Sequence, residues 1–139
     1  MDYEALRQLR MKTNPFARFM GITLTQIREG YAAAEMKGRP ELDNPVGYCH
    51  GGALFTLADV AAGTAAISFG RHAVTVSADY HFLKAGCGEG VFIAEARSVH
   101  CGRQTIVLQV EIKEKGKEEL LGTACFTYHR LDREIELTE

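Results

Sequence analysis

Residues 50–70 read HGGALFTLADVAAGTAAISFG, and this stretch decides what the rest of the chain must surround. It is rich in Ala and Leu and poor in residues that favour strands, so its composition predicts a helix over residues 51–70. Apolar residues lie on nearly every side of that helix, which is typical of a helix buried at the centre of a domain. Asp59 is its one charged residue.

The segments around this helix alternate between apolar and polar residues, as strands do. They are residues 22–29, 31–37, 74–83, 91–101, 103–114 and 118–130. Strict alternation would put Thr75 and Ser77 on the same face of their strand. A helix packed on one face of an antiparallel sheet is an α+β arrangement.

Two short helices are expected before the first strand. Residues 2–12 carry apolar residues at a spacing of three, which indicates an amphipathic helix. Asn14 and Pro15 suit the start of a second helix, with Asn14 as the N-cap and Pro15 at the first helical position. We expect one domain over residues 1–139, with residues 1–20 as an N-terminal helical segment.

Composition argues against several classes of function. The formal net charge is −2 over 139 residues, whereas nucleic-acid-binding proteins usually carry a basic excess. No uncharged apolar run reaches the ~20 residues that span a bilayer, and the N-terminus lacks the apolar stretch of a secretory signal. The four cysteines do not have the spacing of a zinc site. We therefore expect a cytoplasmic protein with free thiols, no metal, no cofactor and neither a nucleic-acid nor a membrane partner.

The buried position of Asp59 needs an explanation, because a carboxylate in an apolar helix is costly unless something compensates for it. One explanation is structural: a buried Arg, backbone donors or a gap open to solvent would satisfy the charge. The other is functional: a partly desolvated carboxylate in a cavity acts as a general base or a nucleophile.

The start of the helix offers a second candidate group. His50, Gly51 and Gly52 lead directly into it, and unpaired N–H groups at a helix N-terminus suit a polarised carbonyl or an oxyanion. Gly51 and Asp59 are eight residues apart, which is ~12 Å along one helix. One copy of the helix can hardly bring both groups to one carbonyl. If both are catalytic, two chains must meet in a two-fold dimer with two equivalent sites.

Residues 44–59, NPVGYCHGGALFTLAD, resemble the signature of hotdog-fold acyl-CoA thioesterases of the phenylacetate-pathway (PaaI-like) type. The likeness extends over residues 14–130. It implies a hotdog fold, with a five-stranded antiparallel sheet wrapped around the long central helix. It also implies homodimers with active sites at the subunit interface, often paired into homotetramers.

The resemblance further implies a role for each matching residue. Asp59 matches the acidic catalytic residue, and Gly51 matches the backbone N–H donor that polarises the thioester carbonyl. Asn44 matches a polar residue that positions the water or the thioester. His50 matches the motif histidine, whose expected task is to orient the loop. Ser77 matches a strand residue that helps to place the nucleophilic water.

The expected reaction is hydrolysis of an acyl-CoA to a carboxylic acid and CoA, with Asp59 acting as general base or as nucleophile. Gly52 and Arg103 are the expected substrate-binding residues, and Arg103 would meet the CoA phosphates. Two alternatives remain open. One is a hotdog dehydratase or hydratase of 3-hydroxyacyl thioesters, which would pair His50 with Asp59. The other is a non-catalytic acyl-CoA-binding protein. The acyl group is not specified by these residues.

Overall fold

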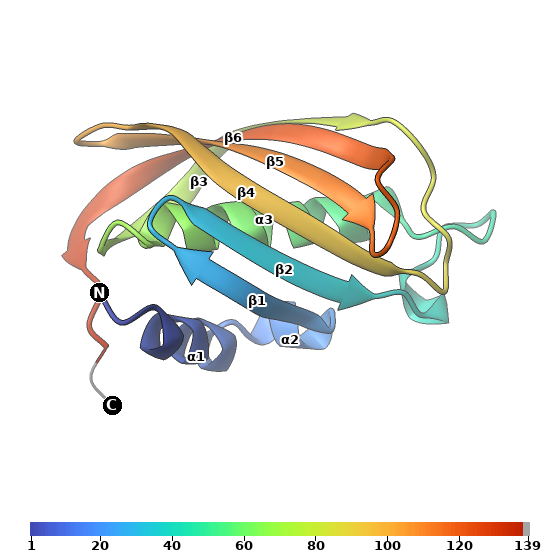
Figure 1. Cartoon of the computed structure of the whole chain (residues 1–139), viewed down its shortest axis with the longest axis horizontal. Coiled ribbons are helices and arrows are strands. Elements are labelled where there is room, and N and C mark those ends of the chain that lie inside the picture. Colours follow the sequence, from blue (N-terminus) through green and yellow to red (C-terminus); the bar gives the residue numbers. More distant parts are fainter. Residues whose placement is uncertain (138–139) are drawn as a thin grey trace.

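A six-stranded antiparallel sheet curves around one long helix in the computed structural model, which describes residues 1–137 (Figure 1). The strand order is β1-β2-β4-β5-β6-β3. The strands are β1 (Ile22–Arg28), β2 (Tyr31–Lys37), β3 (Arg71–Phe82), β4 (Val91–Cys101), β5 (Thr105–Glu114) and β6 (Leu120–Glu134). The expected hotdog fold is confirmed, but the expected count of five strands is wrong, because β1 pairs along β2 and adds a sixth.

The central helix, α3 (Gly51–Ile67), lies against the concave face of the sheet and contacts all six strands. Ala58, Ala61 and Ala62 are fully buried along it, and these small side chains let the strands approach the helix closely. The helix begins at Gly51 as predicted. It ends at Ile67, three residues before the predicted end, because the chain turns into β3 at Gly70, where φ is +104°.

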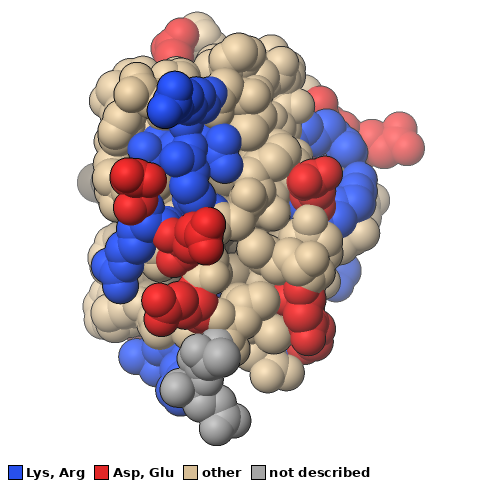
Figure 2. Space-filling model, turned by 90° about the vertical axis from the view of Figure 1, so that its left-hand side faces the viewer, with Lys and Arg blue, Asp and Glu red and all other residues tan. Residues whose placement is uncertain are grey.

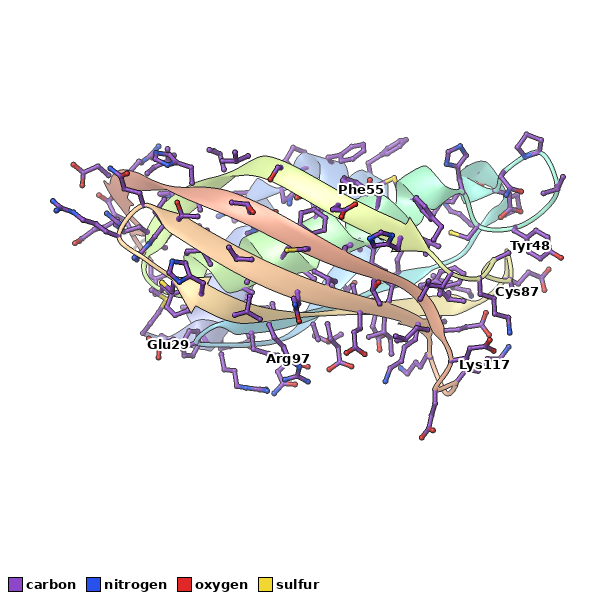
Figure 3. All side chains as sticks on the ribbon, turned by 90° about the horizontal axis from the view of Figure 1, so that it is seen from above. Glu29, Tyr48, Phe55, Cys87, Arg97 and Lys117 are labelled. Carbon is purple, nitrogen blue, oxygen red and sulfur yellow. The ribbon has the colours of Figure 1, made fainter. Side chains whose placement is uncertain are left out.

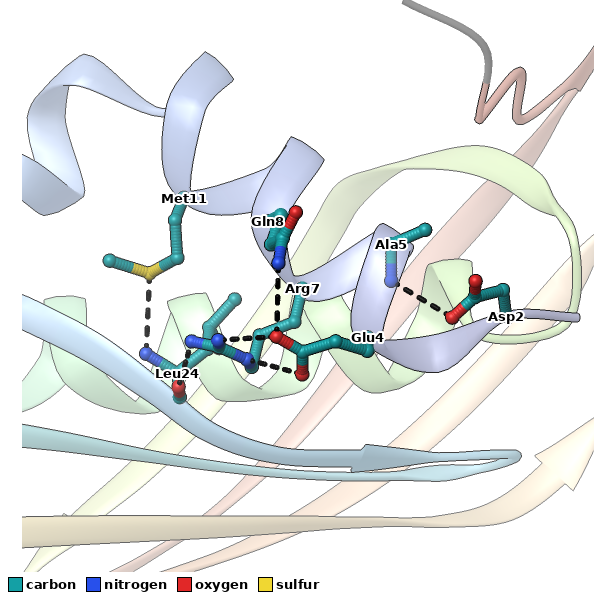
Figure 4. Close-up of polar contacts among 7 residues, drawn as sticks. All are labelled: Asp2, Glu4, Ala5, Arg7, Gln8, Met11 and Leu24. Carbon is teal, nitrogen blue, oxygen red and sulfur yellow. Dashed lines mark hydrogen bonds and ion pairs between the residues drawn. The ribbon is translucent and has the colours of Figure 1, made fainter.

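Two N-terminal helices, α1 (Tyr3–Thr13) and α2 (Pro15–Phe19), run below β1 in Figure 1, and a short 3-10 turn, η1 (Pro40–Leu42), follows β2. Asn14 caps α2 as predicted, since its side chain accepts a hydrogen bond from Ala17 N at 3.1 Å. Helix α1 is attached to the edge of β1 through Leu24 (Figure 4). Leu24 N donates to Met11 Sδ at 3.3 Å, and Arg7 Nη1 donates to Leu24 O at 3.4 Å. This edge of the sheet is therefore covered.

The opposite edge, β3, is left open. Its apolar residues Val74, Val76 and Phe82 are 48%, 63% and 60% exposed. The register of β3 against β6 shifts between Thr75 and Ser77, so Val76 is the extra residue of a β-bulge. Thr75 lies opposite Tyr128 and faces α3, whereas Ser77 lies opposite Thr127 and faces away from it. The prediction that Thr75 and Ser77 share a face is wrong, because strict alternation does not allow for the bulge.

Candidate active site

The first turn of α3 leaves one backbone donor free. His50 is the N-cap, and its Nδ1 accepts a hydrogen bond from Gly52 N at 2.8 Å. Ala53 N and Leu54 N both donate to His50 O. Within residues 1–137, Gly51 N has no hydrogen-bond partner. His50 therefore caps the start of the helix and Gly51 N is left as a potential donor, while the roles of both residues in a reaction stay predictions.

Gly52 takes part in the cap instead of presenting a second free N–H. A Cβ built on Gly52 would lie 3.1 Å from His50 Nδ1, so the glycine leaves room for the capping imidazole. Gly52 lines a groove of about 250 Å³ with Phe16, His50 and Thr56, on a different side of the helix start from Gly51. Any contact between Gly52 and a substrate stays a prediction.

Gly51 and Asn44 lie in the same groove. It has a volume of about 320 Å³ and is also lined by Tyr48, Leu54 and Phe82. Asn44 Oδ1 accepts hydrogen bonds from Val46 N and Tyr48 N, both at 3.0 Å, and this closes the loop that leads to the helix. The amide nitrogen of Asn44 makes no hydrogen bond among the described residues, so it is available as a donor. Figure 3 shows Tyr48 next to Cys87 at this end of the sheet.

Two hydroxyl groups hold the Asp59 carboxylate. Thr75 Oγ1 donates to Asp59 Oδ1 at 3.0 Å, and Tyr128 Oη donates to the same oxygen at 2.5 Å. Asp59 Oδ2 accepts no hydrogen bond from the described residues, and it is not among their buried unpartnered atoms. Burial of the Tyr128 phenol, followed by the Asp59 charge, raises the pKa of Tyr128 far above its usual value. Tyr128 therefore stays protonated and remains a donor to Asp59.

One copy of the chain does not bring Asp59 to Gly51. The two residues are eight positions apart on the continuous helix α3, and the groove that holds Gly51 does not include Asp59. The side chain of Ser77 is not brought to Asp59 either, because it faces the outer side of the sheet. The hydroxyl of β3 that contacts Asp59 belongs to Thr75.

Arg103 lies in a basic hollow at the other end of β3. The hollow has a volume of about 220 Å³ and is lined by Arg71, Arg103, Gln104, His129, Arg130 and Asp132. Arg71 donates to the Arg103 carbonyl, and Arg130 Nη1 donates to Gly102 O at 3.0 Å. Arg130 Nε is buried without a partner among the described residues. Figure 2 shows Lys and Arg side chains gathered on this side of the molecule, with carboxylates among them. The hollow can accept an anion.

Sequence reasoning missed Thr75 and Tyr128. Thr75 is two residues from the predicted Ser77, but the bulge that turns it inward leaves no signature in the alternation of side chains. Tyr128 is 69 residues from Asp59, and nothing in the spacing of a single sequence links the two.

Cys49 is a buried thiol. Burial and the charge of Asp43 raise the pKa of Cys49 to about 11, so it is a poor nucleophile at neutral pH. Among residues 1–137, no three His, Cys, Asp or Glu side chains converge to hold a metal ion. In the same part of the chain, no helix is both long enough and apolar enough to cross a bilayer.

Comparison with known proteins identifies relatives of similar length. Residues 46–121 match the thioesterase superfamily. The acyl-coenzyme A thioesterase PaaI of Escherichia coli (strain K12) is 36% identical over 96 residues, which cover 69% of each chain. The structure of the E. coli PaaI protein from the phenylacetic acid degradation operon has a TM-score of 0.89 at 29% identity, covering 96% of this chain and 98% of that chain. A Streptococcus mutans UA159 protein bound to acetyl CoA has a TM-score of 0.79 at 28% identity, covering 84% and 94%.

Proposed function

This chain belongs to the thioesterase superfamily, and on that premise we propose that it hydrolyses acyl-CoA thioesters in active sites shared by two copies of the chain. Each site would take Gly51 and Asn44 from one copy and Asp59 from the other. The S. mutans relative that binds acetyl CoA supports a CoA thioester as the substrate.

One observation carries the proposal. Strand β3 contacts Asp59 near its start and Gly51 at its end, and it is an edge strand whose outer edge pairs with no strand among the described residues. Near its start, Thr75 contacts Asp59. At its end, the Phe82 ring covers Gly51, since a Cβ on Gly51 would lie 2.8 Å from that ring. Two copies of one edge strand related by a two-fold axis must run antiparallel. Such pairing places the Gly51 end of one copy beside the Asp59 end of the other.

The same pairing places the basic hollow near the composite site. Arg71 opens β3 and contacts Arg103, so both lie at the end of β3 that carries Thr75 and Asp59. A CoA thioester with its carbonyl between Asp59 and the other copy's Gly51 would have cations at the same end for its phosphates. We assign this contact to Arg103.

The reaction follows from the groups that meet there. The thioester oxygen accepts a hydrogen bond from Gly51 N–H, which stabilises the negative charge that develops on it and contributes ~10²–10³ in rate. In one route the free Oδ2 of Asp59 removes a proton from water as the water oxygen attacks the carbonyl carbon, and the C–S bond then breaks to release CoA, whose thiolate takes up that proton. In the other route Oδ2 attacks the carbonyl carbon and the CoA thiolate leaves and is protonated by solvent; water then hydrolyses the resulting anhydride to the carboxylic acid and restores Asp59. The Asn44 amide positions the water or the thioester. Thr75 replaces Ser77 as the strand hydroxyl at the carboxylate.

A panel of aryl, medium-chain and hydroxylated acyl-CoAs tests this function, with release of the CoA thiol as the readout. We expect thiol release from at least one member. Loss of enoyl absorbance without thiol release would indicate a hydratase instead, and binding without turnover would indicate a non-catalytic acyl-CoA-binding protein. Light scattering of the same sample separates the dimer that the site requires from the tetramer that the family resemblance implies.

A further inference from the structure

Asp59 lies in a group of polar residues that comes from four elements of the fold: β3, β6, its own helix α3 and α1. Thr75 on β3 and Tyr128 on β6 bond the same carboxylate oxygen. Tyr128 Oη also lies 3.0 Å from the Asp59 carbonyl, so the phenol is fixed against both the side chain and the backbone of the helix. Tyr128 itself is only 3% exposed, and its ring stacks on Phe126 with a centroid distance of 6.3 Å. The tyrosine is thus a rigid support for one oxygen of the carboxylate.

The fourth element is α1, which brings Arg10 to the same place. Arg10 Nε donates to Thr64 Oγ1 on α3 at 3.4 Å. Burial lowers the pKa of Arg10, while the charge of Asp59 acts in the opposite direction. A guanidinium stays protonated in proteins, so this half-buried cation is attracted by the charge of Asp59, although the two side chains form no ion pair among the described residues.

Gly63 provides the space in which these groups meet. It lies one turn beyond Asp59 on α3. A Cβ at this position would lie 2.8 Å from Arg10 Nη2 and 3.1 Å from Tyr128 Oη. The guanidinium of Arg10 and the hydroxyl of Tyr128 therefore both lie next to Gly63, behind the Asp59 carboxylate.

We propose that Tyr128 is a positioning residue for the hydrolysis, because it holds Oδ1 of Asp59 so that the free Oδ2 faces the substrate, and that the charge of Arg10 supports this arrangement from behind. The inference rests on the proposed function. Neither residue touches the substrate, because each lies on the inner side of the carboxylate. Helix α1 is fixed by Arg7 and Met11 on Leu24, which keeps Arg10 in register with α3 (Figure 4). Through Arg10, α1 therefore supports the surroundings of Asp59 and Tyr128, although it lies outside the region that matches the superfamily.

The test is the Tyr128→Phe variant, which keeps the ring and removes only the hydroxyl. With an acyl-CoA that the wild type turns over, we expect kcat to fall at least ~10-fold with KM changed by less than about twofold, since a misaimed base slows the chemical step more than binding. The matched control is Tyr31→Phe, because Tyr31 Oη donates to the Glu95 carboxylate at 2.7 Å on the outer face of the sheet. This control loses the same kind of hydrogen bond and should keep its kcat.

Arg10→Met is the second variant, with Lys12→Met as its control because Lys12 is an exposed cation on the same helix, and it decides the question by the same kcat criterion if Tyr128→Phe does not fold. Asp59→Asn is measured alongside. An inactive Asp59→Asn together with a Tyr128→Phe or Arg10→Met variant that matches its control would overturn the positioning role alone. An active Asp59→Asn would overturn the catalytic assignment of Asp59 and the positioning role with it.

Discussion

In the proposed mechanism Asp59 meets two requirements: it must be tolerated inside an apolar helix, and it must keep one oxygen free to react. The two carboxylate oxygens of Asp59 have different surroundings. Oδ1 receives the hydroxyls of Thr75 and Tyr128, and Oδ2 receives none from the described residues. A half-buried arginine, Arg10, also lies near Asp59, but it donates to Thr64 and forms no ion pair with Asp59 among the described residues. The structural and the functional explanation of Asp59 are therefore compatible, since the groups that stabilise the charge also leave Oδ2 free.

The Asp59→Asn variant separates the structural role of Asp59 from its proposed chemical role. Asparagine has the same shape, and its Oδ1 still accepts from both hydroxyls, so we expect a folded protein with the wild-type assembly. Its amide cannot take a proton from water or attack a carbonyl, so we expect kcat to be at least ~10²-fold lower than that of the wild type. Thiol release and light scattering measure the two properties on one sample. Near-normal turnover of an assembled variant would mean that another group is the base.

The candidate site was predictable where its residues are close together in sequence. Asn44, His50, Gly51 and Asp59 lie within one motif, and the structure gives Gly51 a free N–H and gives His50 the cap. Tyr128 was not predictable, because it reaches Asp59 only through the pairing of β6 with β3. Contacts that form only when distant strands pair cannot be predicted from the periodicity of a single sequence.

At the scale of elements, the two edges of the sheet are treated differently. The β1 edge is covered by α1, whereas β3 exposes apolar side chains along an unpaired edge. Such an edge is open to pairing with a second chain. Sequence patterns located both strands, and they could not indicate which would be an edge or where a bulge would change the side-chain order. The edge positions follow from strand order, which depends on long-range contacts.

Charge on the free edge should separate the subunits. We expect the double variant Val74→Lys, Val76→Lys to be monomeric, because two like charges would meet their counterparts across a paired edge. Its thiol release should be lost while the fold is retained by circular dichroism. Val99→Lys is the control, since Val99 is 56% exposed on β4, away from this edge. A double variant that remains dimeric and active would exclude β3 as the contact.

At the scale of the whole molecule, β3 spans ~36 Å at 3.3 Å per residue and separates the two binding regions of one chain. The Gly51 groove lies at its end, and the Arg103 hollow lies at its start. In the proposed two-fold dimer, the groove of one copy would lie next to the hollow of the other. The substrate would therefore be bound by both chains, with its phosphates on one and its carbonyl oxygen on the other.

Arg103→Ala tests the phosphate contact. We expect KM for an acyl-CoA to rise about 5-fold to 20-fold, in line with the loss of a charge-assisted hydrogen bond. An N-acetylcysteamine thioester of the same acyl group has no phosphates, so its KM should not change. Equal effects on both substrates would instead mean that Arg103 acts on the fold or on the chemistry.

Mixing two inactive variants tests the shared site most directly. Gly51→Pro removes the N–H donor, and proline suits the first position of a helix. Gly51→Ala is its control, because it adds a Cβ beside the Phe82 ring but keeps the N–H. Gly51→Pro and Asp59→Asn are unfolded together and refolded as an equal mixture. If each site takes Gly51 from one chain and Asp59 from the other, random pairing gives half mixed dimers with one intact site each, and about a quarter of the wild-type activity returns. A mixture as inactive as its two components would contradict the shared site.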